Sequence, residues 1–289
     1  MSKYLKNNDD VDIVFGFPPE YLKGLIESNS VEKLDKHIDS NVMENLAPAI
    51  MEPIKQAGNG DVYAVTPTFN SYTLAYNKNI FKEIGVKKPV SGMNWEDVYT
   101  LSQEIQSKSN YKGVSLGLPS SDEEFYYLYQ IISRPIYSIQ ENNNEISINN
   151  TVNQKYWSLF SKIYIDNERA NDKEFLKGNV GMAILPVANL MDKELFQTFA
   201  AQDLKIEIVE MPIFSENEGG LAYSDSLFAI SSKSKNIEAA ASFLEYIQGK
   251  EFATYLSSGS LLPSYWDNEI KDSFIEKYNF DPTPIYQQR

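Results

Sequence analysis

The 289-residue chain contains no cysteine and only one histidine. Without cysteine it has no disulfide, no thiol nucleophile and no thiolate metal site. The one histidine, His37, lies in VEKLDKHIDS among charged neighbours, which is typical of a surface position. A single imidazole is too few for the usual histidine-based zinc centres, and nothing around His37 indicates a Ser-His-Asp triad. The common metal and nucleophile chemistries are therefore not predicted.

Long apolar runs and phosphate-binding loops are also missing. No segment approaches the roughly 18 consecutive apolar residues that a membrane span needs. Neither GxxxxGK[ST] nor GxGxxG occurs, so nucleotide chemistry lacks its two best-defined sequence signals. The opening MSKYLKNNDD is polar throughout and contains no apolar core of a signal peptide. We therefore expect no signal peptide in this chain, and no cofactor.

Positive charge is scarce. Lysine and arginine number 26 against 40 aspartates and glutamates, which gives a formal net charge of −14. Nucleic-acid recognition needs a basic face, and anionic membranes attract basic segments, so neither partner is expected. The hydrophobic share of 42%, with 13% aromatic residues, is ample for a packed core. The length allows one large or two medium domains.

Strand-like and helical segments alternate along the chain, which predicts the α/β class. Asn94 and Asn236 are predicted to cap two of the helices. The clearest helical segments are 94–108, 122–133, 151–167 and 236–249, and the clearest strands are 11–16, 62–67, 113–119, 180–186, 205–212 and 221–231, the last with a polar middle.

Two enzyme-like patterns stay open as alternatives. Carboxylate pairs such as Asp122–Glu124 are expected by chance among 40 acidic residues, but a glycosidase pair need not be close in sequence. Tyr126 and Tyr127 could supply phenolate ligands to ferric iron, although apolar neighbours at helical spacing favour a core face. We predict neither catalysis nor a metal site from these patterns.

Four segments, in order, resemble the bacterial extracellular solute-binding proteins, family 1. AYNKNIFKEIGVKKPVSGMNWEDVYTLSQEI (75–105) is similar to that family's Tyr-Asn-Lys, short Gly-terminated helix and Thr-Trp-Glu-Glu helix start. EFLKGNVGMAILPVANL (174–190) resembles its Phe-x-x-Gly-x-x-Ala-Met strand. SDSLFAISSKSKNIEAAASFLEYIQGKEFATYLSSGSLLPS (224–264) is similar to its Ala-Ile-Ser strand, following helix and Leu-Pro, and VDIVFG (11–16) to its Pro-Asp-Val-Val strand.

This resemblance implies a two-lobe, periplasmic-binding-protein-like α/β fold of type II, with hinge strands between the lobes. Residues 1–69 and 227–289 would form lobe 1 and residues 70–226 lobe 2. The polar-aromatic stretches TFNSY (68–72) and AYSDS (222–226) would be the two crossings. Relative to the family, the chain lacks a signal peptide and a strand, helix and strand before residue 11, and it also lacks the last helices. Lobe 1 is therefore expected to be incomplete.

Ligand in this architecture would lie in the cleft at the crossings, on aromatic platforms with a few placed polar groups. Phe15 and Phe17 are candidates because they lie at the carboxyl end of the first strand, and open α/β sheets bind ligands at the carboxyl ends of strands. In the loop where the family often places a cleft aromatic, LPVANL has none. The remaining candidates are Phe69, Asn70, Tyr72, Tyr126, Asn189, Tyr223, Ser224 and Asp225.

The implied function is the binding component of an ABC importer, which closes its hinge around a sugar or oligosaccharide and has no chemistry of its own. The implied partners are the small-molecule ligand and the membrane permease subunits, and the protein would be a monomer. The implied location is the outer face of a bacterial cytoplasmic membrane, through a lipid anchor in the full-length protein, or the periplasm. The alternatives are a carbohydrate-active enzyme, a non-transport sensor or adhesion protein of the same fold, and a ferric-ion binder.

Overall fold

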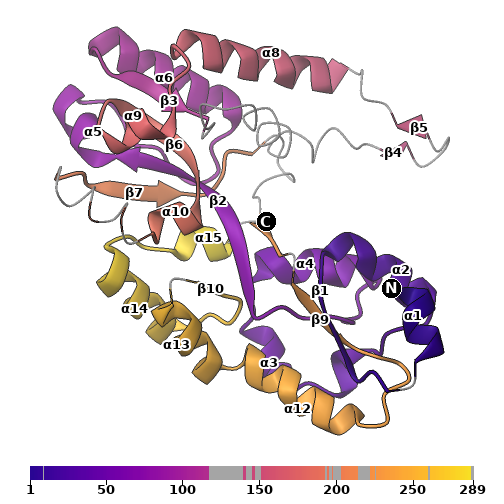
Figure 1. Cartoon of the computed structure of the whole chain (residues 1–289). Coiled ribbons are helices and arrows are strands. Elements are labelled where there is room, and N and C mark those ends of the chain that lie inside the picture. Colours follow the sequence, from indigo (N-terminus) through magenta and orange to yellow (C-terminus); the bar gives the residue numbers. More distant parts are fainter. Residues whose placement is uncertain are drawn as a thin grey trace. The chain divides into compact units, whose positions relative to one another are not determined.

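The computed structural model describes residues 1–8, 10–116, 139–140, 145–146, 151–192, 194, 197, 203–213, 222–224, 226–259 and 261–287 (Figure 1). The predictions for Tyr126, Tyr127, Asp225 and the helix at 122–133 lie outside these residues. The chain divides into two compact units, Met1–Ser71 with Ala222–Gln287 (unit 1) and Tyr72–Leu221 (unit 2). Within the described ranges, no helix is both long and apolar enough to cross a membrane.

The strands of unit 1 form a small antiparallel pair and a three-stranded set around the start of β2. β1 (Ile13–Phe17) pairs with β9 (Leu227–Ile230), and β2 (Thr68–Asn77) pairs at its first residues with β8 (Ala222–Tyr223) and β10 (Leu262–Pro263). The predicted strand at 62–67 was wrong, because only Val65 makes a bridge, to Phe228. The Val62 amide instead donates to the Asp35 carboxylate at 3.0 Å.

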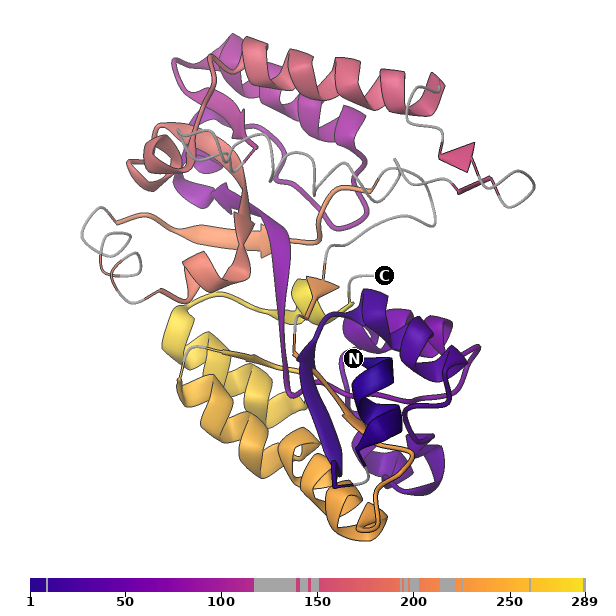
Figure 2. The same cartoon turned by 45° about the vertical axis from the view of Figure 1, so that its right-hand side comes forward.

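Helices surround these strands in unit 1, and α12 runs into α13 along one side in both views (Figures 1 and 2). The helix predicted over 236–249 is confirmed as α12, but its predicted cap was wrong. The Asn236 side chain donates to the Asp12 carboxylate at 3.2 Å instead of capping the helix. The helices are α1 (Ser2–Asn7), η1 (Pro19–Tyr21), α2 (Leu22–Glu27), η2 (Leu34–Lys36), α3 (Ser40–Glu44), α4 (Pro48–Ala57), α12 (Ile237–Gln248), α13 (Lys250–Ser258), α14 (Asn268–Tyr278) and α15 (Thr283–Gln287).

Unit 2 is built on a sheet in the order β3-β6-β2-β7. β6 (Val180–Pro186) and β7 (Ile206–Val209) flank the second part of β2 as antiparallel neighbours. β3 (Lys112–Ser115) is parallel to β6, with Ser115 opposite Ala183. The other elements are α5 (Lys78–Ile84), α6 (Trp95–Lys108), α8 (Thr151–Asp166), α9 (Asp172–Leu176), α10 (Val187–Leu190) and the short pair β4 (Ile139–Gln140) and β5 (Glu145–Ile146).

The core of unit 2 lies between this sheet and helices α6 and α8, which run next to each other in both views (Figures 1 and 2). Asn94 caps α6, as predicted, and the structure shows that it does so in a capping box with Asp97. The apolar face of α6 is buried, and the Trp95 ring meets the Phe160 ring of α8 edge-on with centroids 4.6 Å apart. Gly113 lets α6 approach β3, because a Cβ there would lie 2.4 Å from the Ser102 carbonyl oxygen.

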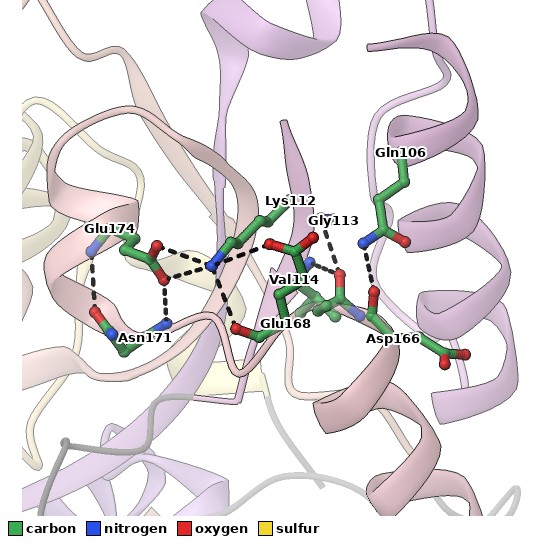
Figure 3. A network of polar contacts seen from close by, with 9 residues as sticks. Gln106, Lys112, Gly113, Val114, Asp166, Glu168, Asn171 and Glu174 are labelled. Atoms are coloured by element: carbon green, nitrogen blue, oxygen red, sulfur yellow. Dashed lines mark hydrogen bonds and ion pairs between the residues drawn. The ribbon is translucent and has the colours of Figure 1, made fainter. Parts of the chain in front are cut away.

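A network of polar groups joins the amino-terminal end of β3 to the segment between α8 and α9 (Figure 3). The fully buried Asn167 side chain accepts hydrogen bonds from the Gly113 and Val114 amides, both at 2.9 Å, and donates to the Ile163 carbonyl. Beside it, the Lys112 ammonium lies 2.9 Å from the Glu174 carboxylate. These bonds satisfy buried groups at the edge of the sheet and fix where α9 begins.

Candidate functional site

In unit 1, the start of β2 is held by a cluster of three aromatic rings. The Phe69 ring meets the Tyr286 ring edge-on, with centroids 5.3 Å apart. On Tyr286 stacks the Trp266 ring, with centroids 3.8 Å apart. The Tyr286 hydroxyl donates to the Pro263 carbonyl at 2.9 Å, and burial raises the pKa of this phenol. Phe69 is only 6% exposed, so in this structure its ring serves the core of unit 1.

The polar candidates near the unit boundary already hold local structure. The Asn70 side-chain oxygen accepts from the Ser71 amide at 2.9 Å, and the Asn70 backbone pairs with Tyr223. The Ser224 hydroxyl lies 2.9 Å from that of Thr66 and accepts from the Ser226 amide at 3.2 Å. Ser224, which follows β8, is therefore joined by a hydrogen bond to Thr66, two residues before β2.

Phe15 and Phe17 lie two residues apart in β1 but have opposite surroundings. Phe15 is 67% exposed and stacks on Phe228 at 5.5 Å, whereas Phe17 is 1% exposed. Regular alternation would place both side chains on one face of the sheet. Between them Gly16 has a φ of +75° and the register shifts, so a β-bulge re-aims one of the two rings. The Phe15 ring is therefore exposed at the surface, and the Phe17 ring packs in the core.

In unit 2, the candidates gather where strands end. β3 and β6 are parallel, so their carboxyl ends point to the same side of the sheet, and the antiparallel β2 enters the sheet from that side at Tyr72. Tyr72 pairs with Pro186 at this edge and is buried against the core of unit 2. Asn189 is half-buried on α10, which directly follows β6. This edge is the position at which open α/β sheets bind ligands.

Sequence reasoning missed a pair of polar side chains at the carboxyl end of β3. The Ser115 hydroxyl, at the last residue of β3, donates to the Asp172 carboxylate at 3.2 Å. Burial raises the pKa of Asp172 to about 6, and the Ser115 hydrogen bond acts in the opposite direction. In the sequence, Asp172 looks like an ordinary acidic residue of a helix's first turn. The only available signal was Ser115, a polar residue in an otherwise apolar strand.

Neither unit shows a metal centre in its described residues, where no group of three or more His, Asp or Glu side chains could hold an ion. The ferric alternative depends on Tyr126 and Tyr127, which lie outside those residues. The chemistry that the described groups offer is hydrogen bonding and ring stacking.

The family model for the bacterial extracellular solute-binding proteins matches residues 2–254. The chain belongs to this family. The resemblance seen in the sequence is therefore confirmed. The description of the family is that of extracellular proteins. No curated protein matches the sequence.

Solved structures show that the fold is the two-lobe fold of sugar-binding ABC substrate-binding proteins, as predicted. A cyclic α-maltosyl-1,6-maltose binding protein from Arthrobacter globiformis matches with a TM-score of 0.65 and 16% identity, over 99% of this chain and 74% of that one. A sugar transporter from Rhizobium etli in an open conformation matches with a TM-score of 0.62 and 15% identity, over 97% and 74%. A Listeria monocytogenes substrate-binding protein in complex with cycloalternan matches with a TM-score of 0.58 and 18% identity, over 99% of this chain and 73% of that one.

Proposed function

We propose that this solute-binding protein captures a sugar or oligosaccharide and delivers it to the permease subunits of an ABC importer. Family membership over residues 2–254 carries the proposal, because the family's description is that of a solute binder. The similar structures include a cyclic α-maltosyl-1,6-maltose binding protein and a substrate-binding protein in complex with cycloalternan. A carbohydrate offers ring faces that stack on aromatics and hydroxyls that bond to amides and carboxylates.

In this proposal the ligand contacts both units and stabilises a closed state by its higher affinity for that state. Unit 1 would contribute Phe15 and Asn70, and unit 2 would contribute Asn189. The protein would act as a monomer outside the cytoplasmic membrane, held there by a lipid anchor or free in the periplasm. No catalytic step is needed for this role.

Thermal unfolding against a ligand panel tests the proposal. The panel contains cyclic α-maltosyl-1,6-maltose, cycloalternan, maltose and α-D-tagatose, with amino acids, polyamines and ferric citrate as the other ligand classes. A ligand present at 100 times its Kd stabilises the folded state by about 2.7 kcal/mol, which raises the unfolding midpoint measurably. We expect a shift with at least one carbohydrate. The proposal would be contradicted if only ferric citrate raised the unfolding midpoint, or if no carbohydrate of the panel raised it.

The enzyme alternative is tested on the same samples. Prolonged incubation of each oligosaccharide with the protein, followed by chromatography, should return the sugar intact. New reducing ends would favour a carbohydrate-active enzyme, since Asp172 has the raised pKa that a general acid needs.

A further inference from the structure

Asp172 and Ser115 meet at the carboxyl end of β3, and open α/β sheets bind ligands outside the carboxyl ends of their strands. Ser115 ends β3 and lies opposite Ala183 of the parallel neighbour β6, which continues to Pro186 and is followed by α10. Asp172 is the first residue of α9, which comes back to the sheet after α8. The hydrogen bond of 3.2 Å between the two side chains brings a carboxylate to the carboxyl end of β3.

The carboxylate of Asp172 is not needed to start the helix. Asn171 caps α9, with its side chain accepting from the Glu174 amide at 3.1 Å and its own amide donating to the Glu174 carboxylate at 3.2 Å. This capping box satisfies the helix start without Asp172. The helix dipole favours an acidic residue in this first turn, but no hydrogen bond of the helix start uses the Asp172 carboxylate.

Among the described residues, the nearby cations form no ion pair with Asp172. Lys112 on β3 lies 2.9 Å from Glu174 and 3.9 Å from Glu168. Figure 3 shows the Lys112 ammonium between these two side chains. Lys173, next to Asp172 on α9, is exposed. Among the described residues, Ser115 is the hydrogen-bond partner of the Asp172 carboxylate. A partly buried carboxylate with one hydroxyl partner retains unused acceptor positions.

We propose that Asp172, oriented by Ser115, is the residue of unit 2 that accepts hydrogen bonds from the hydroxyl groups of the bound carbohydrate. This rests on the proposed function and adds to it a recognition residue and a pH dependence. Protonation removes the charged acceptor, so the affinity for a neutral sugar falls as the pH drops. With a pKa of about 6, the change is centred near pH 6 in the free protein.

Isothermal titration calorimetry with the four sugars of the panel tests the proposal at pH 7.5 and pH 5.0. We expect the wild type to bind at least one sugar, with an affinity several-fold lower at pH 5.0. Asp172→Asn should bind about tenfold more weakly at pH 7.5, because a hydrogen bond to a charged acceptor is lost, and its affinity should change little with pH.

Asp166→Asn is the matched control. Asp166 is a carboxylate of the same unit that also accepts from a hydroxyl, that of Tyr99 at 2.6 Å, but it lies at the end of α8 near Gln106. This variant should bind with the affinity and the pH dependence of the wild type. Equal losses in both variants would overturn the proposal, because the effect would then come from general damage to unit 2.

The remaining outcomes separate this inference from the proposed function. If the wild type binds a sugar and Asp172→Asn binds it equally well with the same pH profile, the inference fails and the function stands. If no sugar binds to the wild type, the function fails and the inference with it. Should Asp172→Asn not fold, Ser115→Ala decides. Loss of the Ser115 donor should move the pH midpoint of binding upward, and an unmoved midpoint overturns the proposal.

Discussion

The two ends of β3 use polar residues in opposite ways. At the amino-terminal end, Asn167 and the Lys112–Glu174 pair use their hydrogen-bonding groups on neighbouring backbone and side chains (Figure 3). At the carboxyl end, Asp172 is half-buried and accepts one hydrogen bond, from the Ser115 hydroxyl. Satisfied groups stabilise a fold, whereas a desolvated group without a full set of partners costs stability and is retained where function needs it. If the proposal for Asp172 holds, one end of β3 belongs to the scaffold and the other to the binding site.

Removing the side chain of Asn167 should have the largest effect. Asn167→Leu leaves the Gly113 and Val114 amides buried without an acceptor. Each unsatisfied amide costs about 1–3 kcal/mol, so the free energy of unfolding should fall by about 3–5 kcal/mol. Chemical denaturation measures this. Asn79→Leu is the control, since that exposed amide makes one side-chain bond, to the Asp203 carbonyl, and should cost under about 1 kcal/mol.

Replacing Asp172 should have the opposite sign. Its pKa is raised from 3.8 in the unfolded chain to about 6, so the folded state holds the proton more tightly. The free energy of unfolding contributed by this group is therefore lost as the pH rises from about 4 through 6. Above pH 7, Asp172→Asn should stabilise the unliganded protein by about 1–3 kcal/mol, and below pH 4 the difference should vanish.

Denaturation midpoints at pH 4 and pH 8 check this second effect. A variant that is less stable than the wild type at pH 8 would mean that Asp172 belongs to the scaffold, like Asn167. Gain of stability together with loss of sugar affinity is the behaviour expected of a binding residue.

The same contrast occurs in unit 1, where a bulge separates exposed Phe15 from buried Phe17. Gly16→Ala should cost about 1–2 kcal/mol, because its φ of +75° is unfavourable for a side chain although nothing lies within 4 Å of the added methyl. Gly24→Ala is the matched control. Its surroundings are equally open and it lies in helix α2, so alanine should raise stability by about 0.5–1 kcal/mol. Equal effects at both positions would show that the strained backbone of the bulge is not what matters.

Much of the scaffold is predictable because its signals are local. The cap at Asn94 and the helix predicted over 94–108 depend on neighbours within a few positions, and both are confirmed. The Asn236 cap failed because a distant group, the Asp12 carboxylate, binds its amide more favourably than the helix end does. The strand predicted at 62–67 failed similarly, since the Val62 amide bonds to Asp35.

The candidate site was harder to predict, because it depends on which residues the fold brings together. No periodicity in the sequence separates Phe15 from Phe17, and the difference arises from a register shift against β9. Asp172 and Ser115 are 57 positions apart, and each alone has an ordinary explanation. The family resemblance indicated the class of protein, but the assignment of binding residues remains a set of predictions.

Truncating Phe15 should have the smallest effect on stability and so isolates its role at the surface. Phe15→Ala removes the stacking of this ring on Phe228 at a position that is 67% exposed. The free energy of unfolding should therefore fall by about 0.5–1.5 kcal/mol. Phe17→Ala, in the core, should cost about 3–5 kcal/mol. If Phe15 is a stacking platform for the ligand, its variant should lose about tenfold or more in sugar affinity measured by calorimetry, while its unfolding midpoint stays near that of the wild type. Unchanged affinity would assign this exposed ring to the pairing of β1 with β9 and leave recognition to the edge of the unit 2 sheet, where Asp172 lies.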